Sequence, residues 1–64
     1  MIKLGDMLNT EKSGYRKLWL CKWVPTGEYQ VLALVWDEVN DVAKGWATVY
    51  GGTIAGARRF IKNW

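Results

Sequence analysis

The sequence has no histidine, a single cysteine and a single proline among its 64 residues. Without histidine, neither a Ser-His nor a Cys-His catalytic pair can be assembled, and the zinc sites built from paired cysteines and histidines are excluded. Because Cys21 is the only thiol, no disulfide can form within the chain. We therefore expect a protein that is not an enzyme and that holds no metal and no cofactor.

Long apolar stretches are also missing. The longest run of apolar residues covers six positions, residues 31–36, which is far too short to cross a membrane. No charged and apolar signal segment precedes it. Together with the lone thiol, these features predict a cytoplasmic protein without a membrane partner.

Length and composition predict one small domain that spans residues 1–64. A chain of this length buries only about 60% of the surface that its unfolded form exposes, so its core is thin. Five tryptophans are more than such a core easily encloses, and nine Lys and Arg residues outnumber six Asp and Glu residues, for a net charge of +3. We expect part of the aromatic surface to face a partner.

Two segments predict a β-hairpin. Residues 29–36 contain the run of six apolar residues and predict a central strand that is buried on both faces, while the alternation in residues 15–24 predicts the first strand. Pro25 and Gly27 between them are typical of a tight turn, since proline presets its backbone angle and glycine tolerates a positive φ. Residues 15–24 should therefore pair with residues 29–38.

The remaining elements complete the predicted fold. Residues 42–50 fit either a strand or a helix, and we favour a strand because Gly45 weakens a helix. Thr53 should cap a helix over residues 53–64, whereas residues 1–14 should form a short irregular or helical segment. The prediction is an α+β fold: a three-stranded antiparallel β-meander packed by a C-terminal α-helix.

The only acidic cluster, Asp37, Glu38 and Asp41, follows the central strand. Three carboxylates invite comparison with an acid/base or cation site, but the spacing of a calcium loop is absent. We expect a solvated turn.

Aromatic and basic residues share one predicted face. In a strand over residues 15–24, Tyr15, Lys17, Trp19 and Trp23 point the same way, and a neighbouring strand would add Trp46 and Tyr50. Single-stranded nucleic acid is bound by aromatic side chains on which its bases stack and by cations that contact its phosphates. The leading hypothesis is a small binding module for single-stranded DNA or RNA, with contacts from the following residues: Lys17, Trp19, Trp23, Trp46, Arg58 and Arg59.

The alternative is a regulatory or inhibitor module that uses the same tryptophan-rich face to bind a protein partner or a second copy of itself. Trp, Tyr and Arg also dominate the energetics of protein interfaces. Salt separates the two hypotheses, because phosphate contacts weaken steeply with ionic strength and apolar contacts do not.

Overall fold

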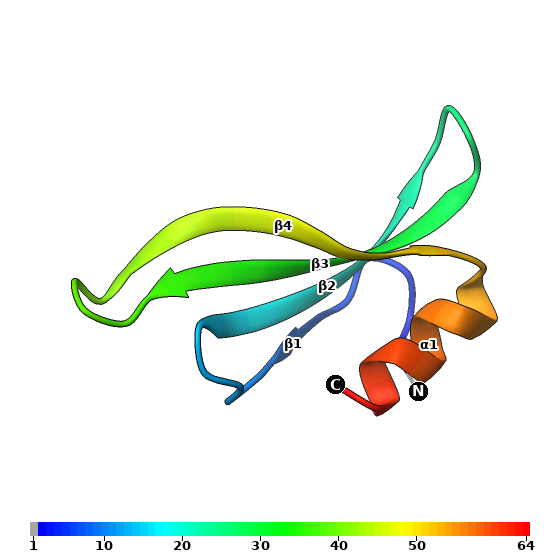
Figure 1. The fold of residues 1–64 in the computed structure, drawn as a ribbon. Helices are drawn as coiled ribbons and strands as arrows, with labels where there is room; N and C mark the ends of the chain where they lie inside the picture. The colour runs from blue at the N-terminus through cyan, green and yellow to red at the C-terminus, as the bar shows by residue number, and fades with distance from the viewer. Residues whose placement is uncertain (1) are drawn as a thin grey trace.

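The computed structural model describes residues 2–64, which form one antiparallel sheet and one helix (Figure 1). In chain order the elements are β1 (Met7–Asn9), β2 (Tyr15–Trp23), β3 (Glu28–Asp37), β4 (Val42–Gly52) and α1 (Ile54–Lys62). The strands follow the order β1-β2-β3-β4 in the sheet, so each strand pairs with its neighbour in sequence. The α+β meander with a C-terminal helix is confirmed, but the sheet has four strands and not three.

The predicted hairpin is present. β2 pairs with β3 in a register that sets Leu18 opposite Ala33 and Leu20 opposite Val31. Gly27 closes the turn with a φ of 72°, and its N–H donates to the carbonyl oxygen of Trp23 at 2.8 Å. Glycine takes this left-handed backbone conformation without steric cost, which explains why the turn signal in the sequence was reliable.

The ambiguous segment that begins at Val42 is a strand, as favoured. β4 pairs with β3 over nearly its whole length, from Val42 opposite Asp37 to Gly52 opposite Tyr29. Gly45, at which the helical alternative was weakest, has a φ of 136° that no helix contains. The hydrogen-bond ladder to β3 therefore outweighs the helical spacing of the apolar residues.

The N-terminal segment was predicted wrongly as an irregular or helical arm. Met7–Asn9 instead forms the edge strand β1, with Met7 opposite Trp19 and Asn9 opposite Lys17. Gly5, with a φ of 89°, precedes it, and its N–H donates to the carbonyl of Leu20 at 2.8 Å. A three-residue strand has too little alternation to be seen in the sequence, because a partner some ten residues away determines its conformation.

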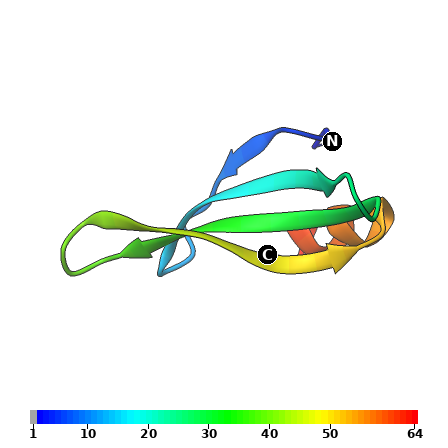
Figure 2. The same ribbon diagram turned by 90° about the horizontal axis from the view of Figure 1, so that it is seen from above.

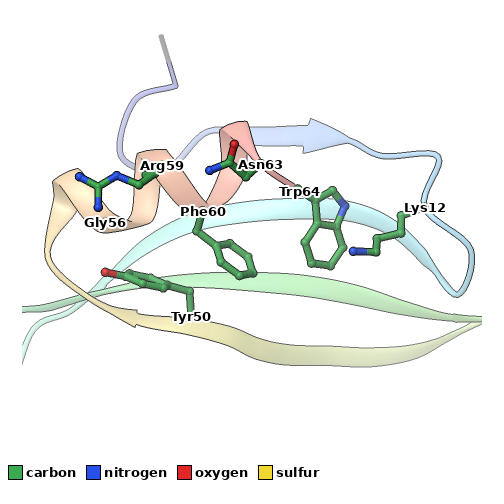
Figure 3. Close-up of a pocket in the computed structure, with 7 residues that line it drawn as sticks. All are labelled: Lys12, Tyr50, Gly56, Arg59, Phe60, Asn63 and Trp64. Carbon is green, nitrogen blue, oxygen red and sulfur yellow. The ribbon is translucent and has the colours of Figure 1, made fainter.

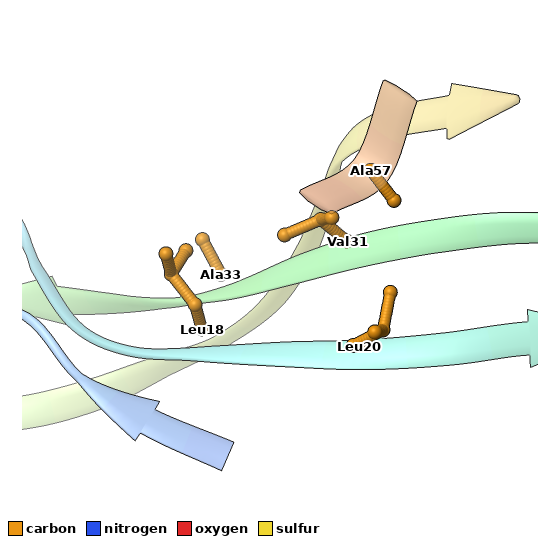
Figure 4. Packing of buried hydrophobic residues seen from close by; sticks show 5 residues of the cluster. All are labelled: Leu18, Leu20, Val31, Ala33 and Ala57. Carbon is orange, nitrogen blue, oxygen red and sulfur yellow. The ribbon is translucent and has the colours of Figure 1, made fainter. Parts of the chain in front are cut away.

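Helix α1 packs on one side of the sheet, near the end at which β4 finishes (Figures 1 and 2). Its Ala57 meets the buried side chains of β2 and β3, and the core consists of five residues (Figure 4): Leu18, Leu20, Val31, Ala33 and Ala57. The predicted cap is confirmed, because the Thr53 hydroxyl oxygen accepts a hydrogen bond from the N–H of Gly56 at 3.1 Å. Among residues 2–64, no helix is both long and apolar enough to span a membrane.

Two β-bulges move two tyrosines away from the face on which alternation had placed them. The β2–β3 register shifts between Tyr15 and Lys17, and the β3–β4 register shifts between Val31 and Leu32, where Val49 is the extra residue. Each bulge reverses the alternation beyond it. Tyr15 and Tyr50 therefore lie on the helix side, where both pack against the core.

Gly56 of α1 packs directly against Tyr50 of β4. A Cβ atom on Gly56 would overlap the hydroxyl oxygen of Tyr50, whose ring is held by Phe60 at a centroid distance of 5.6 Å. We predict that Gly56→Ala lowers the free energy of unfolding by about 1 kcal/mol, since an overlap cost of about 1–3 kcal/mol exceeds the helix-propensity gain of about 1 kcal/mol. Chemical denaturation measures the difference.

The double variant Gly56→Ala with Tyr50→Phe serves as the matched control. It removes the hydroxyl oxygen that the new methyl group would meet first, so it should recover part of the loss; the ring carbon Cζ of residue 50 would still lie 2.9 Å from the new Cβ atom. A single variant more stable than the wild type would show that the approach at Gly56 is loose.

Candidate functional site

The second side of the sheet carries most of the tryptophans and has no helix over it. Because side chains alternate along a strand, the residues between the core positions point to this side. We name this surface the Trp face; it comprises Met7 and Asn9 of β1, Lys17, Trp19, Cys21 and Trp23 of β2, Gln30, Leu32, Leu34 and Trp36 of β3, and Trp46 and Thr48 of β4. Within residues 2–64, α1 is the only helix, and it packs on the opposite side.

Two tryptophans lean toward each other across the middle of the Trp face. Trp19 lies on β2 and Trp46 on β4, yet their ring centroids are only 5.5 Å apart with a tilt of 58°. Since β2 and β4 are separated by two strand spacings, about 9.6 Å, both rings must lean over β3. Leu32 lies opposite Trp19 and Leu34 lies opposite Trp46, and the two rings partly cover these leucines. Both leucines are half-buried.

An ion pair closes one end of the Trp face. Arg16 is the extra residue of the β2 bulge, and its guanidinium lies 4.9 Å from the ring centroid of Trp36. Its Nη1 and Nη2 donate to Oε1 and Oε2 of Glu38 at 2.7 and 2.8 Å. The hydrogen bond from Arg16, helped by one from the N–H of Gly14, lowers the pKa of Glu38 to about 2.

The acidic turn after β3 is ordered by its own hydrogen bonds. Asp37 accepts from the side-chain amide of Asn40, which is the main reason why its pKa is lowered, and also from the N–H of Val39. Asp41, at a φ of 55°, accepts from Nε1 of Trp36 at 3.0 Å. The cluster forms an exposed turn, as expected, and it anchors Trp36 and Arg16 at the end of the Trp face.

The other end of the Trp face is an open apolar groove of about 550 Å³. Trp19, Trp23 and Leu32 line it together with Cys21. Trp23 is 54% exposed there, and burial raises the pKa of the Cys21 thiol. A protonated, half-buried thiol among apolar side chains adds to the apolar character of the groove.

The structure brings together four of the six predicted site residues. Lys17, Trp19, Trp23 and Trp46 share the Trp face, whereas Arg58 and Arg59 belong to α1 on the other side of the sheet. The two arginines were grouped with the tryptophans because the sequence does not show on which side the helix packs. A ligand lying flat on the Trp face does not reach them.

Sequence reasoning missed the leucines, Met7 and Trp36 as parts of this surface. The run of six apolar residues was taken as a strand buried on both faces, but only Val31 and Ala33 of that run are buried in the core. Met7 was missed because β1 was not predicted. Because residues two positions apart on a strand share a face, alternation along β3 would have placed Trp36 on the same face as Leu34.

No protein-family model matches the chain, and neither a curated protein nor a solved structure is detectably similar to it. The surface must therefore be interpreted from its own chemistry. Among residues 2–64, no three Cys, Asp or Glu side chains gather in a way that would hold a metal ion.

The Arg16–Glu38 pair makes stability depend on pH in a defined range. Because the pKa of Glu38 falls from its ordinary value of 4.5 to about 2 on folding, its contribution is complete above about pH 4.5 and disappears as the pH falls toward 2. We predict that Glu38→Gln is less stable than the wild type at neutral pH and that this difference shrinks to nearly nothing at about pH 2. Urea denaturation at a series of pH values measures it.

Glu11→Gln provides the control, because Glu11 is exposed and has no hydrogen-bond partner among residues 2–64. The stability difference between Glu11→Gln and the wild type should stay flat over the same pH range. A Glu38→Gln difference that is equally flat contradicts the assigned role of the pair.

Proposed function

We propose that the protein is a protein-interaction module that pairs with a second copy of itself through the Trp face. One observation carries the proposal: the sheet has a broad tryptophan-rich and leucine-rich face over which no helix lies, while every fully buried residue lies on the helix side. Exposed apolar surface of this extent is typical of a protein interface.

The charges around the Trp face favour an apolar partner over phosphates. Lys17 is the one cation among the residues that define the Trp face, and its Nζ donates to Oδ1 of Asn9 at 3.0 Å, while Lys22 lines the groove at one end. Arg16 is neutralised by Glu38, and Glu28, opposite Trp23, places a further carboxylate at the groove end. A surface that follows a nucleic-acid backbone needs a row of cations.

The tryptophan rings are also partly engaged already. Trp19 and Trp46 lean on each other, and one side of Trp36 is taken by Arg16. Stacked bases need open ring faces, and Trp23 offers the most exposed one. Protein interfaces, in contrast, use such clustered aromatics as packed anchors.

A second copy of this chain suits the face in size and charge. The Cα atoms span 36 × 24 × 15 Å, so the broad side is of the order of the ~800 Å² per partner that a stable interface buries. Two such sheets stack about 10 Å apart, with side chains interleaved. Because the face carries the single cation Lys17 while the carboxylates of Glu38 and Glu28 lie at its two ends, two copies bring together no large charge of one sign.

Binding of single-stranded DNA or RNA stays a prediction, supported by Lys17 with the three tryptophans beside it. A cytoplasmic location also stays a prediction, based on the lone thiol. Neither is needed for the proposal of self-association.

We expect light scattering coupled to size exclusion to give a dimer whose population is unchanged from about 0.01 to about 1 M salt, a range over which the Debye length falls from about 30 to about 3 Å. Trp46→Lys should weaken the dimer about a thousandfold, because it places two charges in an apolar interface and removes two anchors that are each worth about 2 kcal/mol. Trp23→Lys, at a more exposed position, provides a second variant with the same expected direction.

Val39→Lys is the matched control. Val39 is 92% exposed in the turn after β3 and lies outside the Trp face, so the same substitution there should leave the dimer intact. A wild-type protein that stays monomeric at all concentrations contradicts the proposal. If that monomer carries nucleic acid that salt removes, the nucleic-acid hypothesis takes its place.

A further inference from the structure

A second site lies on the helix side, away from the Trp face. A pocket of about 500 Å³ opens between α1, the end of β4 and the loop before β2 (Figure 3). Its size falls within the range of about 300–1,000 Å³ that is usual for small-molecule sites. Seven residues line it: Lys12, Tyr50, Gly56, Arg59, Phe60, Asn63 and Trp64.

Three aromatic rings form a continuous wall of the pocket. Phe60 lies between Tyr50 and Trp64, with ring-centroid distances of 5.6 and 5.7 Å. Figure 3 shows the three rings in a row below the helix. The planes of neighbouring rings are tilted by 31° and 49°, so a planar ligand can stack on one ring and contact the next ring at an angle.

The three rings of the wall are held in place by contacts with neighbouring residues. Trp64 donates from Nε1 to the hydroxyl oxygen of Thr10 at 2.7 Å, and Tyr15 meets its ring edge-on at 5.0 Å. Tyr50 is positioned by the close approach of the helix at Gly56. Because these rings are already ordered, a ligand would not have to order them on binding.

The charged side chains around the wall are both positive. Lys12 Nζ lies 4.2 Å from the ring centroid of Trp64, at one end of the row, and Arg59 lies near the Tyr50 end in Figure 3. Neither cation has a carboxylate partner among residues 2–64, and no Asp or Glu lines the pocket. The Tyr50 hydroxyl and the Asn63 side-chain amide, which add hydrogen-bonding capacity, also have no hydrogen-bond partner within residues 2–64.

We propose that this pocket binds a small planar aromatic anion, a ring system that carries a carboxylate or a phosphate. The ring lies along the wall formed by Tyr50, Phe60 and Trp64. The anionic group is held by Lys12 or Arg59 at an end of that wall, where a charge-assisted hydrogen bond is favourable. This site is independent of self-association, because it lies on the opposite side of the sheet.

The test uses 2-naphthoate as the probe and two-dimensional NMR of the full chain as the readout. The five tryptophans give indole N–H signals that report on both sides of the sheet. We expect 2-naphthoate to move the Trp64 signal in a saturable manner and to leave the signals of Trp19, Trp23 and Trp46 in place. Neutral 2-naphthamide should bind about tenfold more weakly, as expected for one lost charge-assisted hydrogen bond.

Exposed cations provide the variants, so the fold is not at risk. Lys12→Gln or Arg59→Gln, whichever holds the anion, should weaken 2-naphthoate binding about tenfold. Lys62→Gln is the matched control, because it removes the same charge from the same helix but lines a different groove. The proposal is overturned if the acid and the amide bind equally, if neither variant weakens binding, or if the largest shifts occur at the tryptophans of the Trp face.

Discussion

A four-stranded sheet has two faces, and residues 2–64 contain one helix, of nine residues, with which to cover them. That constraint explains the distribution of the side chains. The small residue Ala57 lets the helix settle onto Leu20 and Val31, so the buried core is complete on one side and absent on the other. The uncovered side then carries the surplus tryptophans, and two of them lean over the central strand in place of a missing layer.

Much of the fold could be predicted because its signals are local. Gly27 defines the hairpin turn by its own backbone conformation, and Thr53 caps the helix with its own hydroxyl. β1 could not be predicted in the same way, since three residues contain almost no pattern and take their conformation from pairing with β2. The two bulges are also invisible in the sequence, where nothing local marks them; at the first bulge the extra residue, Arg16, bonds to Glu38, 22 positions away.

The residues of the candidate sites could be predicted only where the side chains alternate regularly along a strand. Lys17, Trp19 and Trp23 lie on the regular stretch of β2 that follows the bulge at Arg16, and they share a face, as expected. Tyr15 and Tyr50 lie beyond bulges, so they joined the helix side and became part of the aromatic packing around Trp64 and Phe60. The side on which a helix packs is a property of the whole chain, and for that reason the arginines of α1 could not be placed from their sequence.

The bulges in β4 have a consequence for how copies can assemble. β4 is an edge strand of 11 residues, which would otherwise present a long row of unpaired backbone groups to a neighbouring molecule. Extra residues near Lys44 and at Val49 interrupt that row, and the opposite edge, β1, has only three residues. Neither edge of the sheet offers the regular row of unpaired backbone groups on which open-ended fibrils grow. Copies that meet through their broad faces would therefore stop at a closed pair.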